Sequence, residues 1–448
     1  MPNLIIYDAN NLDALRADGQ DEYIARKIQI ERAYDYYAGE MKKWLVDPKT
    51  KNELPENVTI NLAQKIIDQS VSMLMGESPE IDAHDDAANA ALEAVIDRSL
   101  DDIFFHTLAA SGAISGHMFV KIVPSANGVR WVLIDPSIVQ AFWLPDDSRR
   151  PIAYKIQWNS GKTEYRQDIA LVDGAWVVRD MTRRSYDGAW ELTAETAWPY
   201  PFPPIVDGQN LPDYQSYYGR SDLTGLEIND AVNFVASNVN LILKHHAHPK
   251  TIGTGVKSEQ VKETAVAGFW AIENDAARVF NLEMQSDLSS SMAYLQFLRN
   301  EFFSQQRAVD IQSVKDKVGA LTNFGLRVFF SDAIQKNNTK KLLYGYIIKE
   351  LAYRTLLLMG YSVNAQDIDV RFSDPMPVND LENASRIKTE LESGIISRET
   401  AAKELGYEWA DETLRMTAEK SSQGASVGQA LLDAMRKMDA TNPASENA

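Results

Sequence analysis

The chain has 448 residues, of which 45% are hydrophobic, and its formal net charge is -18. It contains no cysteine, which excludes disulfides, thiol nucleophiles and thiolate zinc sites and is compatible with a reducing cytoplasm. The length predicts about two to four subdomains. No apolar run approaches the length of a membrane span, so we expect a soluble protein with no membrane partner. The acidic balance argues against a conventional DNA-binding domain, because such domains use Lys and Arg to neutralise phosphates.

Helices are predicted at the N-terminal side of the chain. Residues 21–38 and 62–74 have helical patterns, and Asn61 is placed to cap the second helix. Asp85 and Asp86 lead into a third helix over 87–108, whose apolar residues recur at helical spacing.

From residue 118 the apolar period shifts toward two, which predicts strands. The expected strands are 118–123, 129–134, 139–144, 152–158, 163–172, 175–180 and 190–193. Asn127-Gly128 and Asp173-Gly174 are predicted hairpin turns. Residues 199–204 contain four prolines, so we expect a stiff connector that does not continue a strand.

Two long amphipathic segments follow. Residues 222–246 and 287–310 each place their apolar side chains on one helical stripe, and each spans roughly 35 Å as a helix. His248-Pro249-Lys250 is expected to end the first helix. The glycine-punctuated segment 251–282 between the two helices predicts a small α/β module.

The segment 311–325 is too charged and too interrupted by glycine to continue the second helix. A third long helix is predicted from Leu326 to Gly360, and its polar middle, residues 335–341, indicates a kink or an exposed stretch. Residues 421–448 are small and polar, which predicts a flexible end with one short helix.

Two motifs of enzymes occur in weak form. Gly161-Lys162-Thr163 resembles the end of a phosphate-binding loop, but Ile156 stands where the first glycine of that loop belongs. Residues 424–428 match a nucleophile elbow, yet no strand is predicted before them. We therefore expect no catalytic residue and no cofactor.

Possible metal ligands are also unconvincing. His245, His246 and His248 lie at a predicted helix end, where they are expected to cap carbonyl groups or face water. The adjacent acidic pairs, expected to be solvated, are Asp85-Asp86, Asp101-Asp102 and Asp146-Asp147. We predict no metal site, although a metal-dependent nuclease that uses one of these pairs stays open as an alternative.

A series of short motifs recurs in one order along most of the chain. They occupy residues 34–39, 61–70, 75–79, 116–121, 134–136, 218–223, 323–328 and 394–400, and include Gly116-His117-Met118 and Tyr218-Gly219-Arg220. In this order the chain resembles the bacteriophage portal protein family, the head-to-tail connectors of tailed phages, most closely the type found in phages with long noncontractile tails. The collinearity of the motifs, more than any single one, carries the resemblance.

The resemblance implies an α+β portal fold with a mixed α/β wing, a two-helix stem, a small α/β clip, a long kinked helix and a helical C-terminal crown. Carried over by position, the parts are the N-terminal region and β-rich wing at 1–216, the first stem helix at 217–246, the clip at 247–286, the second stem helix at 287–310, the tunnel loop at 311–325, the kinked helix with a return strand at 326–376, and the crown with its tail at 377–448.

The resemblance also implies a twelve-subunit ring at one capsid vertex of the virion, assembled in the host cytoplasm, through which double-stranded DNA is packaged and ejected. The implied partners are the terminase large subunit, the major capsid and scaffolding proteins, and a head-tail adaptor. Another virion ring component, such as an adaptor or baseplate protein, stays open as an alternative.

For the channel itself we expect an acidic wall, which repels the phosphates that it encloses. The tunnel-loop residues expected to face DNA are Lys315, Lys317, Val314 and Val318. Lys244 and Lys250 are possible channel-lining cations. Phe324 and Gly325 are expected to fix the end of the loop.

Overall fold

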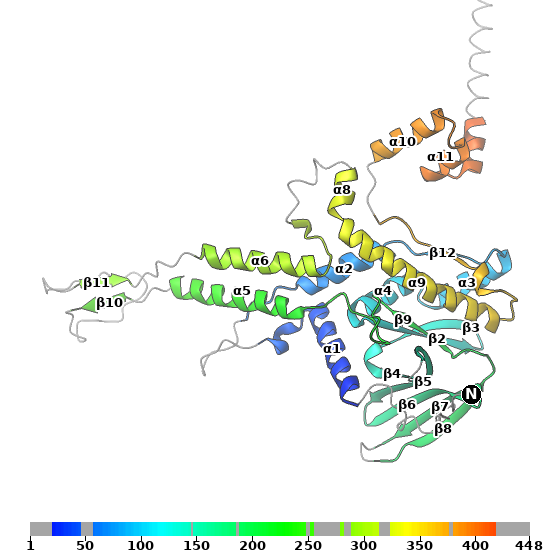
Figure 1. Cartoon of the computed structure of the whole chain (residues 1–448), viewed down its shortest axis with the longest axis horizontal. Coiled ribbons are helices and arrows are strands. Elements are labelled where there is room, and N and C mark those ends of the chain that lie inside the picture. The colour runs from blue at the N-terminus through cyan, green and yellow to red at the C-terminus, as the bar shows by residue number, and fades with distance from the viewer. Residues whose placement is uncertain are drawn as a thin grey trace, which may run out of the picture. The chain divides into compact units, whose positions relative to one another are not determined.

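The computed structural model describes residues 20–45, 57–144, 147–184, 188–247, 251–254, 278–281, 288–312, 323–375 and 380–417. The chain divides into two compact units, Met1–Pro375 and Met376–Ala448. Helices and antiparallel sheets are mixed in the larger unit (Figure 1), which confirms the predicted α+β class. The predicted tail, residues 421–448, lies outside the described residues.

The helices of the N-terminal region form one layer of the main core. They are α1 (Gln20–Ala38), the short η2 (Met41–Trp44), α2 (Leu62–Met75), α3 (Asp86–Arg98) and α4 (Ile103–Ser115). Asn61 caps α2 as predicted, because its side chain accepts a hydrogen bond from the Gln64 N–H. The core cluster of buried residues includes apolar side chains of α2 and α4 together with those of the long C-terminal helix of this unit.

The predicted helix over residues 87–108 is wrong, because the chain breaks into α3 and α4. Leu100 and Asp101 between them have φ values of 81° and 55°, in the left-handed region. The Ser99 hydroxyl donates to the Val95 carbonyl and accepts from the Trp131 N–H, which ties the break to a strand.

The strands between residues 117 and 209 form two antiparallel sheets that share an apolar interface. The first sheet has the order β3-β2-β9, from β2 (His117–Ser125), β3 (Gly128–Ile134) and β9 (Ile205–Gln209). The second has the order β4-β5-β6-β7-β8, from β4 (Val139–Leu144), β5 (Asp147–Ser160), β6 (Thr163–Val172), β7 (Ala175–Arg183) and β8 (Glu191–Trp198). Phe119, Tyr154 and Ile169 belong to the buried cluster that includes residues of both sheets.

The predicted hairpin turn at Asp173-Gly174 is confirmed, since Val172 pairs with Ala175 across it. The hairpin predicted at Asn127-Gly128 is present, but its turn is Ala126-Asn127, because Gly128 pairs with Ser125 as the first residue of β3. Gly161 lies in a third hairpin turn between β5 and β6, with φ at +61°, so the Gly161-Lys162-Thr163 triplet belongs to a hairpin and not to a phosphate-binding loop. The proline-rich connector leads into β9, which the sequence analysis did not predict.

A pair of long helices extends from this body (Figure 1). They are α5 (Leu226–Ala247) and α6 (Ser289–Gln305), which contact each other along the pair. The chain between them includes the antiparallel strands β10 (Thr251–Thr254) and β11 (Arg278–Asn281). We refer to α5 and α6 as the stem.

The predicted third helix is present, but its interruption lies elsewhere than expected. It consists of α8 (Asn323–Phe329) and α9 (Ser331–Leu358), with the break at Phe330. The polar middle at residues 335–341 lies within α9, and Lys336, Asn337 and Lys340 are buried, so the interpretation of this stretch as a kink or an exposed surface is wrong.

Past α9, the short η5 (Ala365–Asp367) leads to β12 (Asp369–Arg371), which pairs with β1 (Glu80–Asp82). The second unit contains α10 (Asp380–Glu392) and α11 (Arg398–Glu404). Ser397 caps α11 by accepting from the Thr400 N–H, which gives the motif at 394–400 a structural role.

Gly116 ends α4 with φ at +86°, and a Cβ there would lie 2.6 Å from the Gly219 carbonyl oxygen. We expect Gly116→Ala to lower the free energy of unfolding by about 3 kcal/mol or more, since a left-handed alanine costs about 1–2 kcal/mol and the close backbone adds to it. Gly174→Ala is the matched control: its φ is +82°, but no atom lies within 4 Å of the added Cβ. Denaturant unfolding measures both, and equal losses would show that the close approach has no effect.

Candidate functional site at the base of the stem

Two of the motifs meet where the stem joins the body. The Asn210 N–H donates to the Gly116 carbonyl at 2.9 Å, and the Asp222 N–H donates to the Ala113 carbonyl at 2.8 Å. The Ser221 hydroxyl lies 3.0 Å from that same carbonyl oxygen. The segment that precedes α5 is therefore fixed to the end of α4 by main-chain hydrogen bonds, which explains why glycine is required at the contact.

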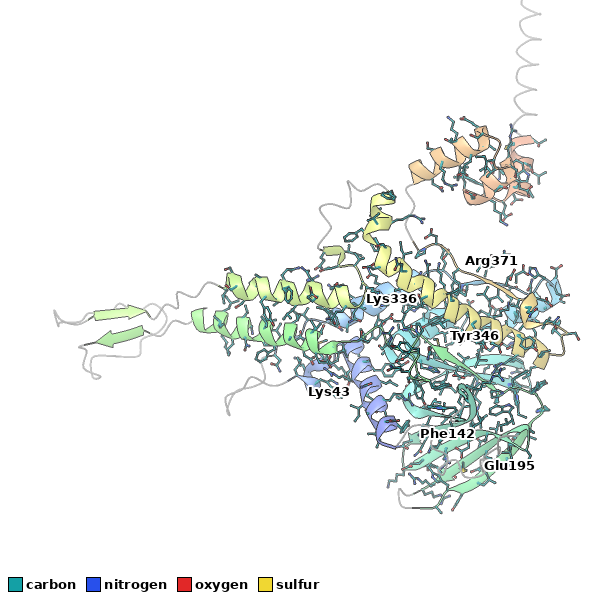
Figure 2. The ribbon with its side chains drawn as sticks, viewed as in Figure 1. Lys43, Phe142, Glu195, Lys336, Tyr346 and Arg371 are labelled. Atoms are coloured by element: carbon teal, nitrogen blue, oxygen red, sulfur yellow. The ribbon has the colours of Figure 1, made fainter. Side chains whose placement is uncertain are left out.

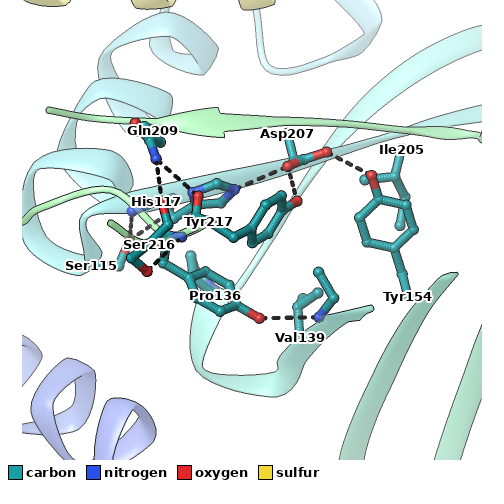
Figure 3. Close-up of polar contacts among 12 residues, drawn as sticks. Ser115, His117, Pro136, Val139, Tyr154, Ile205, Asp207, Gln209, Ser216 and Tyr217 are labelled. Carbon is teal, nitrogen blue, oxygen red and sulfur yellow. Dashed lines mark hydrogen bonds and ion pairs between the residues drawn. The ribbon is translucent and has the colours of Figure 1, made fainter. Parts of the chain in front are cut away.

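Asp207 on β9 accepts three hydrogen bonds close to the segment that precedes α5 (Figure 3). It accepts from His117 Nε2 at 3.0 Å, from the Tyr154 hydroxyl at 2.7 Å, and from the Tyr217 hydroxyl. Burial alone would raise the pKa of Asp207, but these donors hold it below its ordinary value. Burial lowers the pKa of His117, so its imidazole is neutral at pH 7. The cluster joins both sheets to the segment that leads into the stem.

A second buried cluster has Asp222 at its centre. Lys340 Nζ lies 2.5 Å from Asp222 Oδ2, and Lys336 Nζ lies 3.3 Å from Oδ1. Figure 2 shows Lys336 on α9, at the end of the stem that meets the body. Lys340 also donates to the Ser70 hydroxyl on α2, and Lys336 donates to the Gln306 carbonyl after α6. One carboxylate therefore connects α2, α9 and the bases of both stem helices.

The protonation of this cluster follows from its burial. Burial alone would raise the pKa of Asp222, but Lys340 and Lys336 outweigh that effect and hold it well below its ordinary value. Burial lowers the pKa of Lys340 to about 8, although Asp222 partly offsets the effect. The ion pair is consequently formed at pH 7, and Lys340 loses its proton near pH 8.

A polar stripe on α5 binds the extended segment 58–62. Asn233 Oδ1 accepts from the Ile60 N–H at 2.7 Å, and Asn229 Oδ1 accepts from the Leu62 N–H at 3.3 Å. The Ser237 hydroxyl accepts from the Val58 N–H at 3.0 Å. These three α5 residues are buried and follow a four-residue step, so they form a ladder of acceptors along one helix face.

The predicted tunnel loop is described only at its two ends. Before it, Arg299 makes two hydrogen bonds to the carboxylate of Asp310, at 2.6 and 2.9 Å. The Gln69 side chain bonds both the N–H and the carbonyl of Val309. After it, Arg327 pairs with Asp374 at 2.8 Å. The chain therefore enters and leaves this segment at positions that the body holds.

The predicted site residues fall partly outside the described part of the chain. Val314, Lys315, Lys317, Val318 and Lys250 lie outside it. Lys244 lies on α5 near the helix end farther from the body and is exposed.

Phe324 and Gly325, expected at the end of the loop, lie in the first turn of α8. The Phe324 side chain is 77% exposed. The bonds described above at the ends of the loop are made by other residues. Gln69 and Arg327 belong to the motifs 61–70 and 323–328, but the sequence analysis gave neither of them this role. A buried lysine or aspartate carries no local sequence signal, because its partner lies elsewhere in the chain.

The possible metal ligands in the described part of the chain are its His, Asp and Glu side chains. Among them, no group of three or more His, Asp or Glu side chains is placed to hold a metal ion. Asp85, from one of the acidic pairs, caps α3 by accepting from the Ala88 N–H. The side chains of His245, His246 and His248 are outside the described part. In that part, no helix is long and apolar enough to cross a membrane.

A cleft of about 860 Å³ lies between α1 and the segment that leads into α5. Ser115 and His117 both line it, but the Ser115 hydroxyl lies 2.7 Å from the Ser111 carbonyl oxygen and 2.6 Å from that of His117. The hydroxyl thus bonds the main chain and is not paired with the imidazole as a nucleophile would be.

The described residues form a two-helix stem whose base contains buried ion pairs, and the long helix of α8 and α9 follows later in the chain. The chain belongs to the family described as phage portal protein, SPP1 Gp6-like, whose model matches residues 18–170 and 227–424. The match covers the N-terminal helices, strands β2 to β5 and most of β6, the stem, α8, α9 and the second unit up to residue 424.

Solved structures with the same fold come from gene transfer agent (GTA) particles. A chain in the virion of the native particle is 11% identical, with a TM-score of 0.51, and the similarity covers 85% of this chain and 93% of that one. A chain in the neck of the empty particle, computed with C6 symmetry, is 11% identical with a TM-score of 0.50, over 88% of this chain and 97% of that one. A comparison with curated protein sequences gives no match.

Lys340→Met tests the buried cluster. We expect the free energy of unfolding to fall by about 3–5 kcal/mol at pH 7, because buried Asp222 would lose its closest cation and keep the longer contact with Lys336 and the neutral hydrogen bond from Asn210. In the wild type, the free energy of unfolding should rise between pH 8 and 10.5, where the unfolded chain binds the Lys340 proton and the folded chain does not. The variant should lack this rise. Denaturant unfolding across this pH range measures both effects.

Lys341→Met is the control, since Lys341 is the next residue and donates to the Ser373 carbonyl at the surface. Its loss should cost about 1 kcal/mol or less. If Lys340→Met were no more destabilising than Lys341→Met, Asp222 would not depend on Lys340.

Proposed function

We propose that this chain is the portal subunit of a virion, the ring component at one capsid vertex through which double-stranded DNA is packaged and later ejected. The observation that carries the proposal is the family match across both the wing and the stem. The two-helix stem, and the ion pairs of Asp310 and Arg327 on either side of residues 313–322, support the proposal. On this proposal the chain resides at the capsid vertex and is assembled in the host cytoplasm.

A homo-oligomeric ring follows from the same reasoning. A chain of similar fold belongs to the neck of a GTA particle computed with C6 symmetry, which supports a ring. We propose twelve subunits for this protein, the number that the family resemblance implies. Twelve copies would carry roughly 200 net negative charges, and an acidic wall repels DNA phosphates. DNA would therefore slide through the ring without binding tightly to it.

We propose that the terminase large subunit and the head-tail adaptor bind this protein at different stages of virion assembly. The terminase large subunit would dock first and supply ATP hydrolysis, and a head-tail adaptor would replace it, both at the clip, residues 247–286. Major capsid and scaffolding proteins would surround the ring. Clip substitutions that left the binding of terminase and adaptor unchanged in pull-down assays would contradict this assignment.

The ring is tested by the mass and symmetry of the purified protein. We expect native mass spectrometry to give a closed assembly of about twelve subunits, and class averages viewed down the axis to show a central hole. The comparison is the same measurement on assemblies formed together with the scaffolding protein. A chain that stays monomeric under both conditions would argue against the portal function.

The tunnel loop is tested by Lys315→Ala combined with Lys317→Ala. We propose that these lysines restrain DNA at the narrowest point, because an ammonium group makes weak contacts to phosphates. The double variant should assemble normally but retain less full-length genome, measured as packaged DNA per particle. Lys42→Ala with Lys65→Ala, two exposed lysines of the described body, is the control. Normal genome retention in the loop variant would remove these lysines from the mechanism.

A further inference from the structure

The stem carries an exposed aromatic pair on one of its two helices. Tyr294 and Phe297 on α6 are 52% and 55% exposed, and their rings stack at 6.3 Å with an angle of 19° between the planes. They are three residues apart, so they share one face of the helix. Two stacked rings exposed to water form an apolar projection, which we name the α6 aromatic pair. Such a surface gains free energy when another apolar surface covers it.

The other stem helix carries a groove. It has a volume of about 340 Å³ and lies between η2 and α5, with Trp44, Leu45, Ala231 and Phe234 among its lining residues. Phe234 is 50% exposed. The groove also contains the polar residues Asn57 and Asp230, which offer a partner to a tyrosine hydroxyl. We name it the α5 groove.

The groove and the aromatic pair lie on different helices of the stem. On α5, Val232 and Ala236 are buried, whereas Ala231 and Phe234 line the groove. On α6, Leu298 is buried while its neighbour Phe297 is exposed. A subunit with a projection on one helix and a groove on the other fits a head-to-tail contact between copies, which closes into a ring when each copy repeats it.

The two surfaces also lie at the same height along the stem. The helix bases are aligned, because the Thr224 hydroxyl bonds the Gln306 side chain at 3.1 Å. Phe234 is eight residues from the basal end of α5, and Phe297 is eight residues from the basal end of α6. Both are therefore about 12 Å from the base at 1.5 Å per residue. For a stem that runs along the ring axis, rotation about that axis keeps every residue at its height, so neighbouring copies bring these surfaces level.

We propose that the α6 aromatic pair of one copy binds in the α5 groove of the next copy, so that each groove is completed by its neighbour. This inference rests on the proposed ring and names the contact that closes it. The apolar rings of Tyr294 and Phe297 cover Trp44 and Phe234, and the Tyr294 hydroxyl reaches the polar wall of the groove.

Thiol cross-linking tests the contact directly, since the natural chain has no cysteine. One preparation carries Ala231→Cys and another carries Phe297→Cys, and the two are assembled together and treated with a short bis-maleimide. We expect covalent dimers in the mixture and none from either variant alone. The control replaces Phe297→Cys by Met292→Cys, which is also exposed on α6 but lies on a different face, and should give few dimers. Rings from the mixture that yield no dimers would overturn the proposed contact.

A second measurement separates this contact from the ring itself. Phe297→Glu should reduce the assembled fraction at least tenfold by native mass spectrometry, whereas Met292→Glu should change it little. Circular dichroism should show both variants folded, because neither side chain is buried. If Phe297→Glu assembles like the wild type, the contact is wrong and the ring stands. If the wild type forms no ring, either alone or with the scaffolding protein, both proposals fail.

Discussion

Asp222 is fully buried, and a carboxylate in that position is tolerated only because Lys340 and Lys336 lie against it. The cluster does more than neutralise a charge, since its hydrogen bonds reach α2, α9 and the residues at both stem bases. Together with the hydrogen bonds that Asn229, Asn233 and Ser237 of α5 make to residues 58–62, this cluster sets the direction of the stem helices relative to the body.

The second carboxylate, Asp207, fixes the other side of the same segment. It holds Tyr217 and His117, while Asp222, fifteen residues later, holds the helices. Between them, the Asn210 side chain donates a hydrogen bond to Asp222 and accepts one from the Tyr344 hydroxyl on α9. The segment from β9 to α5 is thus bonded to the sheets at one end and to the helical layer at the other. This is how a loop without regular secondary structure can transmit a defined orientation to the stem.

Periodicity predicted the regular parts well. The strand at residues 163–172 was placed at its observed bounds because its turns and alternation are local signals. The break at Leu100 was missed, since non-glycine residues there take left-handed conformations without a turn motif. The polar stretch of α9 was misread as exposed because Asp222, its partner, is 118 residues away from Lys340. The two long helices of the stem were expected where α5 and α6 lie, but no local signal identified Asp207, Lys336 or Lys340.

The acceptor ladder on α5 has an evolutionary consequence. Asn229, Asn233 and Ser237 bind the N–H groups of residues 58–62, and a main chain offers those groups whatever its side chains are. Substitution in the bound segment is therefore restricted mainly by space and by the exclusion of proline at Val58, Ile60 and Leu62. The three α5 positions have no such freedom, since each must supply an acceptor. Among related chains, we expect the sequence of residues 58–62 to vary, while the three α5 positions keep short polar residues.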